Sequence, residues 1–435
     1  MDVGSSALLT DYYELTMLQA ALRSGVAHHR SVFEVFARRL PAGRRYAVAA
    51  GLDRLLEALP CFRFADDELA YLAGGHLVDD DTLHWLADFR FNGCVDAYAE
   101  GELFFPGSPI LIVEAPFGEA VLLETLVLSI LNHDSAIASA AARMAAVADG
   151  RGLVEMGGRR THELAAIAAA RAAYLAGFTS TSNLEAGRRY GIPVAGTSAH
   201  AFTLVHTDEE AAFRAQLSSL GLGTTLLVDT YDTEAGIRRA VEVAGVELGA
   251  VRLDSGDQVE EAHRARALLD QLGATGTRIV VTGDLDEYCI AELAGAPIDG
   301  YGVGTKLVTG SGAPTAELVF KMVARADEPG PDAPLRPVEK LSKNKHTRGG
   351  RKTAWRRLDD EGFAAAEIVV PAGHPTPNQP GRPLQVRVVE SGEVIHRPGL
   401  DEIRKHHLAS RAELRPEFLT VEAGPPALTA TDPSR

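Results

Sequence analysis

Residues 249–283 read GAVRLDSGDQVEEAHRARALLDQLGATGTRIVVTG, an apolar strand-like run, a helical segment and a second apolar run. The same alternation recurs from residue 150 to about residue 309. Its strand-like runs are GLVEMG (152–157), GFTST (177–181), IPVAG (192–196), TTLLVD (224–229), GAVRLD (249–254), TRIVVTG (277–283) and IDGYGVG (298–304). About seven such units predict a parallel sheet, and the glycines at the strand exits favour a closed or nearly closed α/β barrel over an open doubly wound sheet.

The sequence on either side of this repeat has a different character. Residues 1–150 read as an α+β segment, which opens with a helix signature, Asp11 as N-cap and Glu14 three residues later, and ends in a long apolar helix from about 118 to 148. Residues 316–420 are irregular and strand-rich, and residues 421–435 form a polar, proline-containing tail that we expect to be mobile. The predicted organisation is therefore 1–150, a barrel core at 151–315, 316–420 and a tail.

Composition excludes several classes of protein. The chain has 435 residues, and 43 Lys and Arg against 59 Asp and Glu give a net charge of −16, which disfavours nucleic acid and anionic membranes as partners. Its three cysteines, Cys61, Cys94 and Cys289, suggest neither a disulfide framework nor a metal site. The longest apolar run is about half a membrane span and the acidic start is not a signal peptide, so we expect a cytoplasmic protein.

Polar residues gather where the predicted strands end. In a barrel these exits converge on one mouth, where such folds carry out chemistry. Turns after strands favour Gly, Asp, Ser and Thr for conformational reasons alone, but that preference does not explain why Arg and His recur there. The residues at the exits are Arg159, Arg160, Thr181 to Asn183, Thr197 to His200, Asp229, Arg252, Asp254, Asp257, Asp284 and Thr305.

The types of residue at the exits indicate an anionic sugar and a carboxylate. Arg252 can grip a carboxylate bidentately, and Asp254 and Asp257 can hold a ribose diol or Mg²⁺. The runs VTGDLDE (281–287) and GYGVGTK (300–306) offer glycine amides for a phosphate. Neither run is a P-loop or a dinucleotide fingerprint, so a phosphosugar fits better than a dinucleotide.

His200 and Tyr13 each allow a structural and a functional interpretation. A histidine in this position can cap a helix or be buried for packing, but its place at a strand exit beside Thr197 and Ser198 favours a nucleophile that accepts a phosphoryl group. Tyr13 lies just inside the first predicted helix, where an aromatic side chain usually belongs to the core.

Seven motifs carry a family resemblance. They are LLTDYYELTM (8–17), EMGGRRTHE (155–163), STSN (180–183), GTSAHAF (196–202), VRLDSGD (251–257), VTGDLDE (281–287) and GYGVGTKL (300–307). In this order they closely resemble the nicotinate phosphoribosyltransferases. The resemblance implies synthesis of nicotinate mononucleotide from nicotinate and 5-phosphoribosyl 1-pyrophosphate in NAD biosynthesis, coupled to ATP hydrolysis and therefore of the ligase class. It also implies an incomplete α/β barrel, a second domain built from both chain ends, and a head-to-tail homodimer with active sites at the subunit interface.

The resemblance also assigns roles to single residues. His200 would be phosphorylated by ATP, Arg252 would bind the pyridine carboxylate, and Thr197 would border nicotinate. Tyr13 from the partner subunit would stack on the ring, with Met156, where relatives usually have Phe, on its other face. Arg159 would meet the nucleotide phosphate. The ribose and phosphate site would be lined by Asp254, Ser255, Gly283, Asp284, Gly304 and Thr305, with His200, Asp254 and Asp284 as the catalytic set and Mg²⁺ bound through substrate phosphates, with Asp254 or Asp284 as a further ligand.

Substrate choice follows from one position. Nicotinamide-using relatives place Asp where this chain has Asn183, and a carboxylate there would repel nicotinate. Asn183 with Arg252 therefore predicts a preference for the acid. The alternatives are a phosphoribosyltransferase for another pyridine, nicotinamide or quinolinate, or a non-catalytic sensor of pyridine nucleotides.

A basic stretch after the barrel has two interpretations. Four of the seven lysines, Lys340, Lys343, Lys345 and Lys352, lie within it. We favour a solvated surface turn. The second interpretation is a flap that brings Lys340 or Lys343 toward ATP or pyrophosphate.

Overall fold

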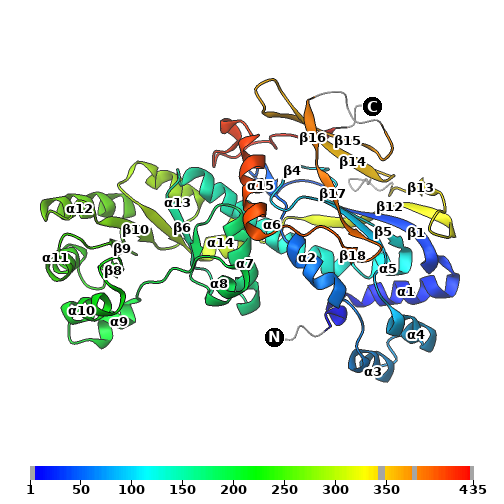
Figure 1. Cartoon of the computed structure of the whole chain (residues 1–435), viewed down its shortest axis with the longest axis horizontal. Coiled ribbons are helices and arrows are strands. Elements are labelled where there is room, and N and C mark those ends of the chain that lie inside the picture. Colours follow the sequence, from blue (N-terminus) through cyan, green and yellow to red (C-terminus); the bar gives the residue numbers. More distant parts are fainter. Residues whose placement is uncertain (1–4, 341–347, 375–379, 432–435) are drawn as a thin grey trace. The chain divides into compact units, whose positions relative to one another are not determined.

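The computed structural model describes residues 5–340, 348–374 and 380–431. They form two compact units, each described here by itself (Figure 1). Unit 1 comprises residues 1–136, 315–418 and 422–435, and unit 2 comprises residues 137–314 and 419–421. The first boundary lies 14 residues before the predicted one at 150, inside the helix α6 (Glu124–Val147).

Unit 2 is built on a parallel sheet in the order β7-β6-β11-β10-β9-β8. The strands are β6 (Gly152–Glu155), β7 (Ser180–Thr181), β8 (Thr225–Leu227), β9 (Ala250–Leu253), β10 (Arg278–Thr282) and β11 (Gly300–Val303). The helices are α7 (Glu163–Leu175), α8 (Leu184–Tyr190), α9 (His200–Val205), α10 (Glu209–Leu220), α11 (Thr233–Ala244), α12 (Gln258–Gln271), α13 (Glu287–Glu292) and α14 (Thr305–Val308). In Figure 1 the helices α10, α11 and α12 flank strands β8, β9 and β10.

One of the seven predicted strands, residues 192–196, does not form a full strand. Val194 makes a single parallel bridge with Thr181, and β8 is left at the far edge of the sheet. Pro193 has no N–H to donate to a ladder, which is one reason that the pairing stops there. Within the residues that the structure describes the sheet therefore stays open between Val194 and β8. This confirms the predicted class, an incomplete parallel α/β barrel, rather than a closed one.

Five helices of unit 2 begin at an aspartate or asparagine cap. The side chains of Asn183, Asp208, Asp232, Asp257 and Asp286 accept hydrogen bonds from backbone N–H groups in the first turns of α8, α10, α11, α12 and α13. Each such cap is worth about 1 kcal/mol. Asp257 accepts a hydrogen bond from Glu260 N at 3.1 Å. This capping role is enough to explain an aspartate at this strand exit without a role in ligand binding.

Unit 1 joins both ends of the chain. Strand β12 (Leu318–Pro329) is antiparallel to β1 (His29–Ala37), with Val35 opposite Phe320. The larger sheet has the order β13-β12-β1-β5-β3-β17-β18. Its other strands are β13 (Leu335–Pro337), β5 (Leu111–Pro116), β3 (Cys94–Tyr98), β17 (Gln385–Glu390) and β18 (Glu393–Val394).

Among the described residues of unit 1, two smaller sheets and six helices accompany the larger sheet and the first part of α6. One sheet has the order β16-β14-β15-β19 and the other pairs β2 with β4. The strands are β16 (Gly381–Pro383), β14 (Lys352–Leu358), β15 (Ala364–Pro371), β19 (Ala430–Thr431), β2 (Ala47–Val48) and β4 (Leu103–Phe104). The helices are α1 (Tyr12–Ser24), α2 (Leu52–Ala58), α3 (Asp66–Gly74), α4 (Asp80–Asp88), α5 (Phe117–Val121) and α15 (Leu400–Ala412).

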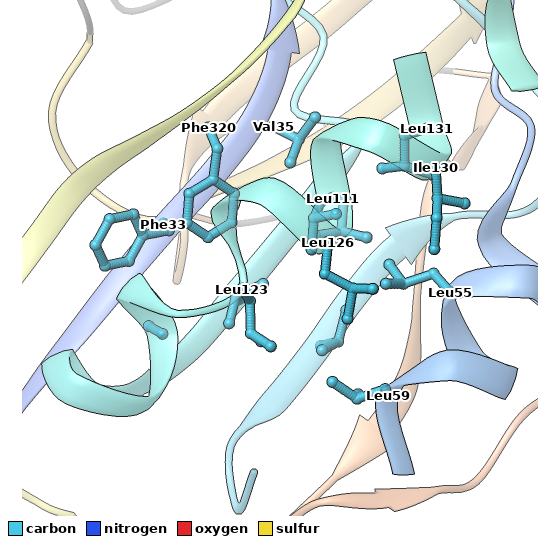
Figure 2. Close-up of a cluster of buried hydrophobic side chains, with 14 of the residues drawn as sticks. Phe33, Val35, Leu55, Leu59, Leu111, Leu123, Leu126, Ile130, Leu131 and Phe320 are labelled. Carbon is cyan, nitrogen blue, oxygen red and sulfur yellow. The ribbon is translucent and has the colours of Figure 1, made fainter. Parts of the chain in front are cut away.

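A hydrophobic core holds unit 1 together. Phe33 of β1 and Phe320 of β12 stack with their ring centroids 4.8 Å apart, so the strand pair is fixed by side chains as well as by its ladder. Figure 2 shows this pair with buried side chains of α2, β5 and α6 around it. The labelled residues are Phe33, Val35, Leu55, Leu59, Leu111, Leu123, Leu126, Ile130, Leu131 and Phe320.

The predicted long apolar helix is broken into two. It forms α5 and α6, separated at residues 122–123. The run Phe117–Val147 is long and apolar enough to cross a membrane, but 61% of its most apolar 18-residue window is buried inside the protein. That burial is typical of a core helix.

Two sequence interpretations in unit 1 need correction. Helix α1 does begin after Asp11, but the Asp11 side chain makes no capping hydrogen bond and Glu14 is not part of a capping box. The Glu14 carboxylate instead accepts from the backbone N–H and the hydroxyl of Thr125. Lys352, one of the basic stretch, forms a 2.7 Å ion pair with Glu34 in which both side chains are at most 5% exposed. It is therefore structural, whereas Lys343 and Lys345 lie outside the described residues.

Candidate active site

The carboxyl ends of strands β6, β9, β10 and β11 surround a cavity of about 230 Å³. Because parallel strands all end at the same edge, residues far apart in the chain meet there. Eight of the predicted site residues line the cavity: Met156, Arg159, Arg252, Asp254, Gly283, Asp284, Gly304 and Thr305. Arg160, Thr282 and Gly302 line it as well.

Arg252 is fixed in place by four hydrogen bonds. Its Nε donates to Thr282 Oγ1 at 2.9 Å, and its Nη2 donates to Asp254 Oδ1 at 3.0 Å. Its Nη1 donates at 3.1 Å both to Thr197 Oγ1 and to the carbonyl of Ser198. A guanidinium has five N–H groups, so these contacts within the described residues leave one Nη2–H for a further acceptor. The full bidentate grip expected from the sequence would require one of these partners to move.

Asp254 is held as an anion. Burial by itself would raise the pKa of this carboxyl, but hydrogen bonds from Thr282 and Arg252 and the positive charge of Arg252 hold its pKa below the ordinary value. Its backbone N–H donates to Asp229 Oδ2 at 2.8 Å. The carboxylate is therefore both ionised and oriented at neutral pH.

His200 lies between two carboxylates. Its Nε2 is 3.8 Å from Asp254 Oδ2 and 4.0 Å from Asp229 Oδ1, and its Nδ1 is 3.2 Å from Thr230 Oγ1. The imidazole is 41% exposed, so a ligand can reach it. His200 and Arg252 thus face different oxygens of the same Asp254 carboxylate. The structure brings together the two residues on which the sequence argument depends, although His200 itself is not among the residues that line the cavity.

Asp229 is a residue to which the sequence assigned no role. Its side chain is 3% exposed, and its Oδ2 accepts from Asp254 N and Ser255 Oγ, both at 2.8 Å. Its buried Oδ1, the oxygen nearest His200, has no hydrogen-bond partner among the described residues. A buried acceptor without a hydrogen bond costs free energy. Oδ1 is therefore suited to accept a hydrogen bond from a protonated Nε2 when the imidazole moves closer. In the sequence, Asp229 directly follows an apolar strand, and this position could have indicated a functional role.

Glycines and one strained aspartate form the wall opposite. Gly283 has φ of +114° and Asp284 has φ of +50°, a left-handed conformation that is uncommon outside glycine. A Cβ on Gly283 would lie 2.7 Å from Asp254 O, and one on Gly302 would lie 2.7 Å from Met156 Sδ. A side chain is thereby excluded at Gly283 and Gly302, so a ligand can approach the backbone closely at these two positions.

A buried glutamate supports the two arginines. Glu155, 1% exposed, accepts from Gly157 N and Thr181 Oγ1, and Arg160 N donates to Gly157 O at 2.8 Å. Burial raises the pKa of Glu155, and these two hydrogen bonds counteract part of that rise. The contacts fix the turn that carries Arg159 and Arg160. The sequence analysis gave Glu155 no role. Its position at the end of an apolar strand, directly before a Met-Gly-Gly turn, could have indicated one.

Five predicted site residues are not among those that line the cavity: His200, described above, and Asn183, Ser255, Thr197 and Tyr13. Asn183 caps α8, with its Oδ1 accepting Ala186 N at 2.9 Å, while its Nδ2 faces Gly158. Ser255 donates to Asp229, and Thr197 accepts from Arg252. Tyr13 belongs to unit 1.

The donor set does not resemble a protein-only metal site. No group of three or more His, Cys, Asp or Glu side chains suited to a metal ion occurs in the part of the chain that the structure describes. Mg²⁺ takes one or two carboxylates together with substrate phosphates, and Asp254 and Asp284 at the cavity fit that pattern.

Comparison with known proteins agrees with the fold and the motifs. A sequence model of the nicotinate phosphoribosyltransferase N-terminal domain matches residues 8–132. A nicotinate phosphoribosyltransferase of Mycobacterium tuberculosis (pncB1) is 55% identical over 99% of this chain and 96% of its own. That of Bacillus subtilis is 40% identical over 82% of this chain and 74% of its own. The crystal structure of human nicotinic acid phosphoribosyltransferase aligns with a TM-score of 0.81 at 27% identity, covering 97% of both chains. On these similarities, the chain belongs to the nicotinate phosphoribosyltransferase family.

Proposed function

We propose that this protein makes nicotinate mononucleotide from nicotinate and 5-phosphoribosyl 1-pyrophosphate in NAD biosynthesis. The observation that carries the proposal is the single carboxylate of Asp254 shared between Arg252 and His200 beside a cavity that is lined in part by glycines. Family membership at 55% identity supports the same activity.

Nicotinate would bind at the Arg252 end of the cavity. The remaining Nη2–H of Arg252 and the hydroxyl of Thr197 can meet its carboxylate together. Met156 would lie against one face of the pyridine ring, where a thioether makes a favourable but less planar contact than an aromatic ring. Tyr13 of the partner subunit would cover the other face, which makes the working enzyme a homodimer.

The phosphosugar would occupy the glycine side. Asp254 and Asp284 can accept from the ribose hydroxyls, while the amides around Gly283 and Gly304, the hydroxyl of Thr305 and the Arg159 guanidinium can bind phosphate oxygens. When bound, Mg²⁺ would supply charge neutralisation for the leaving pyrophosphate. The protein's share is to hold the pyridine nitrogen in line with the reacting carbon, because correct placement of two reactants removes several kcal/mol of the barrier.

ATP would act through His200. We propose that the neutral imidazole attacks the γ-phosphorus of ATP and releases ADP, with Asp229 and Asp254 beside Nε2 orienting the ring and stabilising the positive charge that develops on it. The resulting dianion would favour a tighter arrangement of the loops around the phosphosugar, and its hydrolysis would aid product release. This coupling would place the enzyme in the ligase class, with synthesis stimulated by ATP and Mg²⁺ as cofactor, and we expect it to work in the cytoplasm.

One assay tests the proposal. Purified protein is incubated with nicotinate, 5-phosphoribosyl 1-pyrophosphate and Mg²⁺, with and without ATP, and nicotinate mononucleotide is measured. We expect product in both reactions and more with ATP. Absence of product would refute the activity and favour a sensor, while equal turnover of nicotinamide at matched concentration would refute the preference for the acid.

A further inference from the structure

Two segments of unit 2 that line the cavity each contain a non-glycine residue in the left-handed conformation. The first segment is 283–286, with Asp284 at φ of +50°, and the second is 304–312, with Ser311 at φ of +51°. Asp284 of the first segment and Thr305 of the second line the cavity. A left-handed conformation costs free energy outside glycine, so it persists only where contacts of the surrounding structure hold it.

A buried carboxylate joins the two segments. Glu287, the first residue of α13, directly follows the first segment, and its side chain is 1% exposed. Its Oε2 accepts a hydrogen bond from the hydroxyl of Ser311, which lies in the second segment, 24 positions along the chain. At the cavity the segments also approach each other, with Thr305 Oγ1 3.4 Å from Asp284 Oδ1. The bond between Glu287 and Ser311 is therefore the buried end of a double connection.

An arginine of α6 holds the Glu287 carboxylate in place. Arg143 Nε donates to Glu287 Oε1 at 3.0 Å, and both side chains are at most 3% exposed. Arg143 Nη2 also donates to the hydroxyl of Tyr288 at 3.3 Å and to the carbonyl of Val421 at 3.1 Å. The two oxygens of Glu287 thus serve different partners, Arg143 and Ser311. The carboxylate cannot turn without losing one of these bonds, so Arg143 fixes the position at which Ser311 is held.

We infer that Arg143, Glu287 and Ser311 are positioning residues for the phosphosugar, because they keep the two segments at the separation that 5-phosphoribosyl 1-pyrophosphate requires. This rests on the proposed function, in which the two segments bind the ribose and the phosphates. A separation that is set before binding reduces the conformational freedom lost on binding, so affinity for the phosphosugar rises without direct contact from these three residues. The nicotinate end of the cavity is built around Arg252 and depends on other contacts.

The test measures kcat and the KM for each substrate with the full-length enzyme, ATP and Mg²⁺. Ser311→Ala removes the hydroxyl donor and leaves the buried pair of Arg143 and Glu287 intact. We expect KM for 5-phosphoribosyl 1-pyrophosphate to rise roughly three- to tenfold, within the range for a substitution that acts on a ligand without touching it. KM for nicotinate and kcat should not change. Damage to the fold would instead lower kcat, by reducing the fraction of active enzyme, and would leave both KM values as they were.

A double-mutant cycle tests whether Ser311 acts through Glu287. Glu287→Gln keeps an oxygen acceptor at the same length but removes the charge opposite Arg143. If both substitutions disrupt the same connection, the rise in KM for 5-phosphoribosyl 1-pyrophosphate in the double variant should be smaller than the product of the two single effects. The matched control is Ser219→Ala, at an exposed serine of α10, which should leave both KM values unchanged. Melting temperatures of all variants check the fold.

Two outcomes would overturn the inference. One is a KM for 5-phosphoribosyl 1-pyrophosphate in Ser311→Ala that rises no more than the KM for nicotinate, and the other is a double variant in which the two single effects multiply in full. If Glu287→Gln does not fold, Ser311→Ala still decides the question, because it leaves the buried ion pair in place. Failure of the proposed function is distinguishable, since the unaltered protein would then make no nicotinate mononucleotide.

Discussion

Replacing Glu14 with glutamine should remove a defined pH dependence of stability. The Glu14 side chain is fully buried at the contact between α1 and α6, and burial raises its pKa from 4.5 to about 7, although hydrogen bonds from Thr10 and Thr125 lower the pKa in part. The folded state therefore binds more protons than the unfolded state between these two values. Stability from this group is fully present below about pH 4.5 and is lost as the pH rises toward 7.

The size of the effect follows from the same two values. At about 1.36 kcal/mol for each pKa unit, a rise from 4.5 to about 7 corresponds to roughly 3 kcal/mol. Glutamine carries no charge at any pH and keeps an acceptor oxygen for Thr125. The difference in free energy of unfolding between Glu14→Gln and the unaltered protein should thus shift by about 3 kcal/mol in favour of the variant between pH 4.5 and 8.

Urea unfolding followed by circular dichroism at several pH values measures this quantity. Taking the difference between variant and unaltered protein cancels the titration of other groups and the pH-independent cost of the substitution. Glu234→Gln is the matched control, because the Glu234 side chain is 68% exposed and its partner Arg238 keeps its charge throughout this range, so its difference should be flat. A flat profile for Glu14→Gln over the same range would refute the reasoning.

Four further substitutions probe the site. His200→Ala should abolish ATP hydrolysis and its stimulation of synthesis, and ATP-stimulated activity in this variant would exclude the phosphohistidine. Asp229→Asn should weaken the ATP effect by tenfold or more while sparing ATP-independent synthesis, measured as the ratio of the two rates, because its Oδ1 faces the imidazole. Asn183→Asp keeps the α8 cap, so the melting temperature should not change. The ratio of kcat/KM for nicotinate to kcat/KM for nicotinamide should fall about tenfold. An unchanged ratio would exclude a role for Asn183 in selectivity. Arg252→Lys should lower kcat/KM for nicotinate by roughly a hundredfold, since an ammonium cannot replace the four hydrogen bonds of the guanidinium; a loss below fivefold would contradict that assignment.

The sequence by itself determined the repeating part of the fold. The alternation of strands and helices depends on local sequence, namely on apolar runs of the right length and on helix caps such as Asp232. The parallel sheet and its polar edge can therefore be predicted from each strand–helix unit separately. The convergence of Arg252, Asp254 and Asp284 follows from that repeat, because parallel strands must end together.

Tertiary structure decided what depends on contacts between distant segments. The pairing of β1 with β12 links residues almost 300 positions apart, and nothing local in either strand specifies its partner. Glu14 has the spacing of a capping residue, yet Thr125, 111 positions away, supplies the donors that hold it. The four partners of Arg252 come from three separate loops and strands, which set how many of its N–H groups remain for a substrate. A side chain's free donors and its pKa are properties of its surroundings in space, and those exist only once the chain has folded.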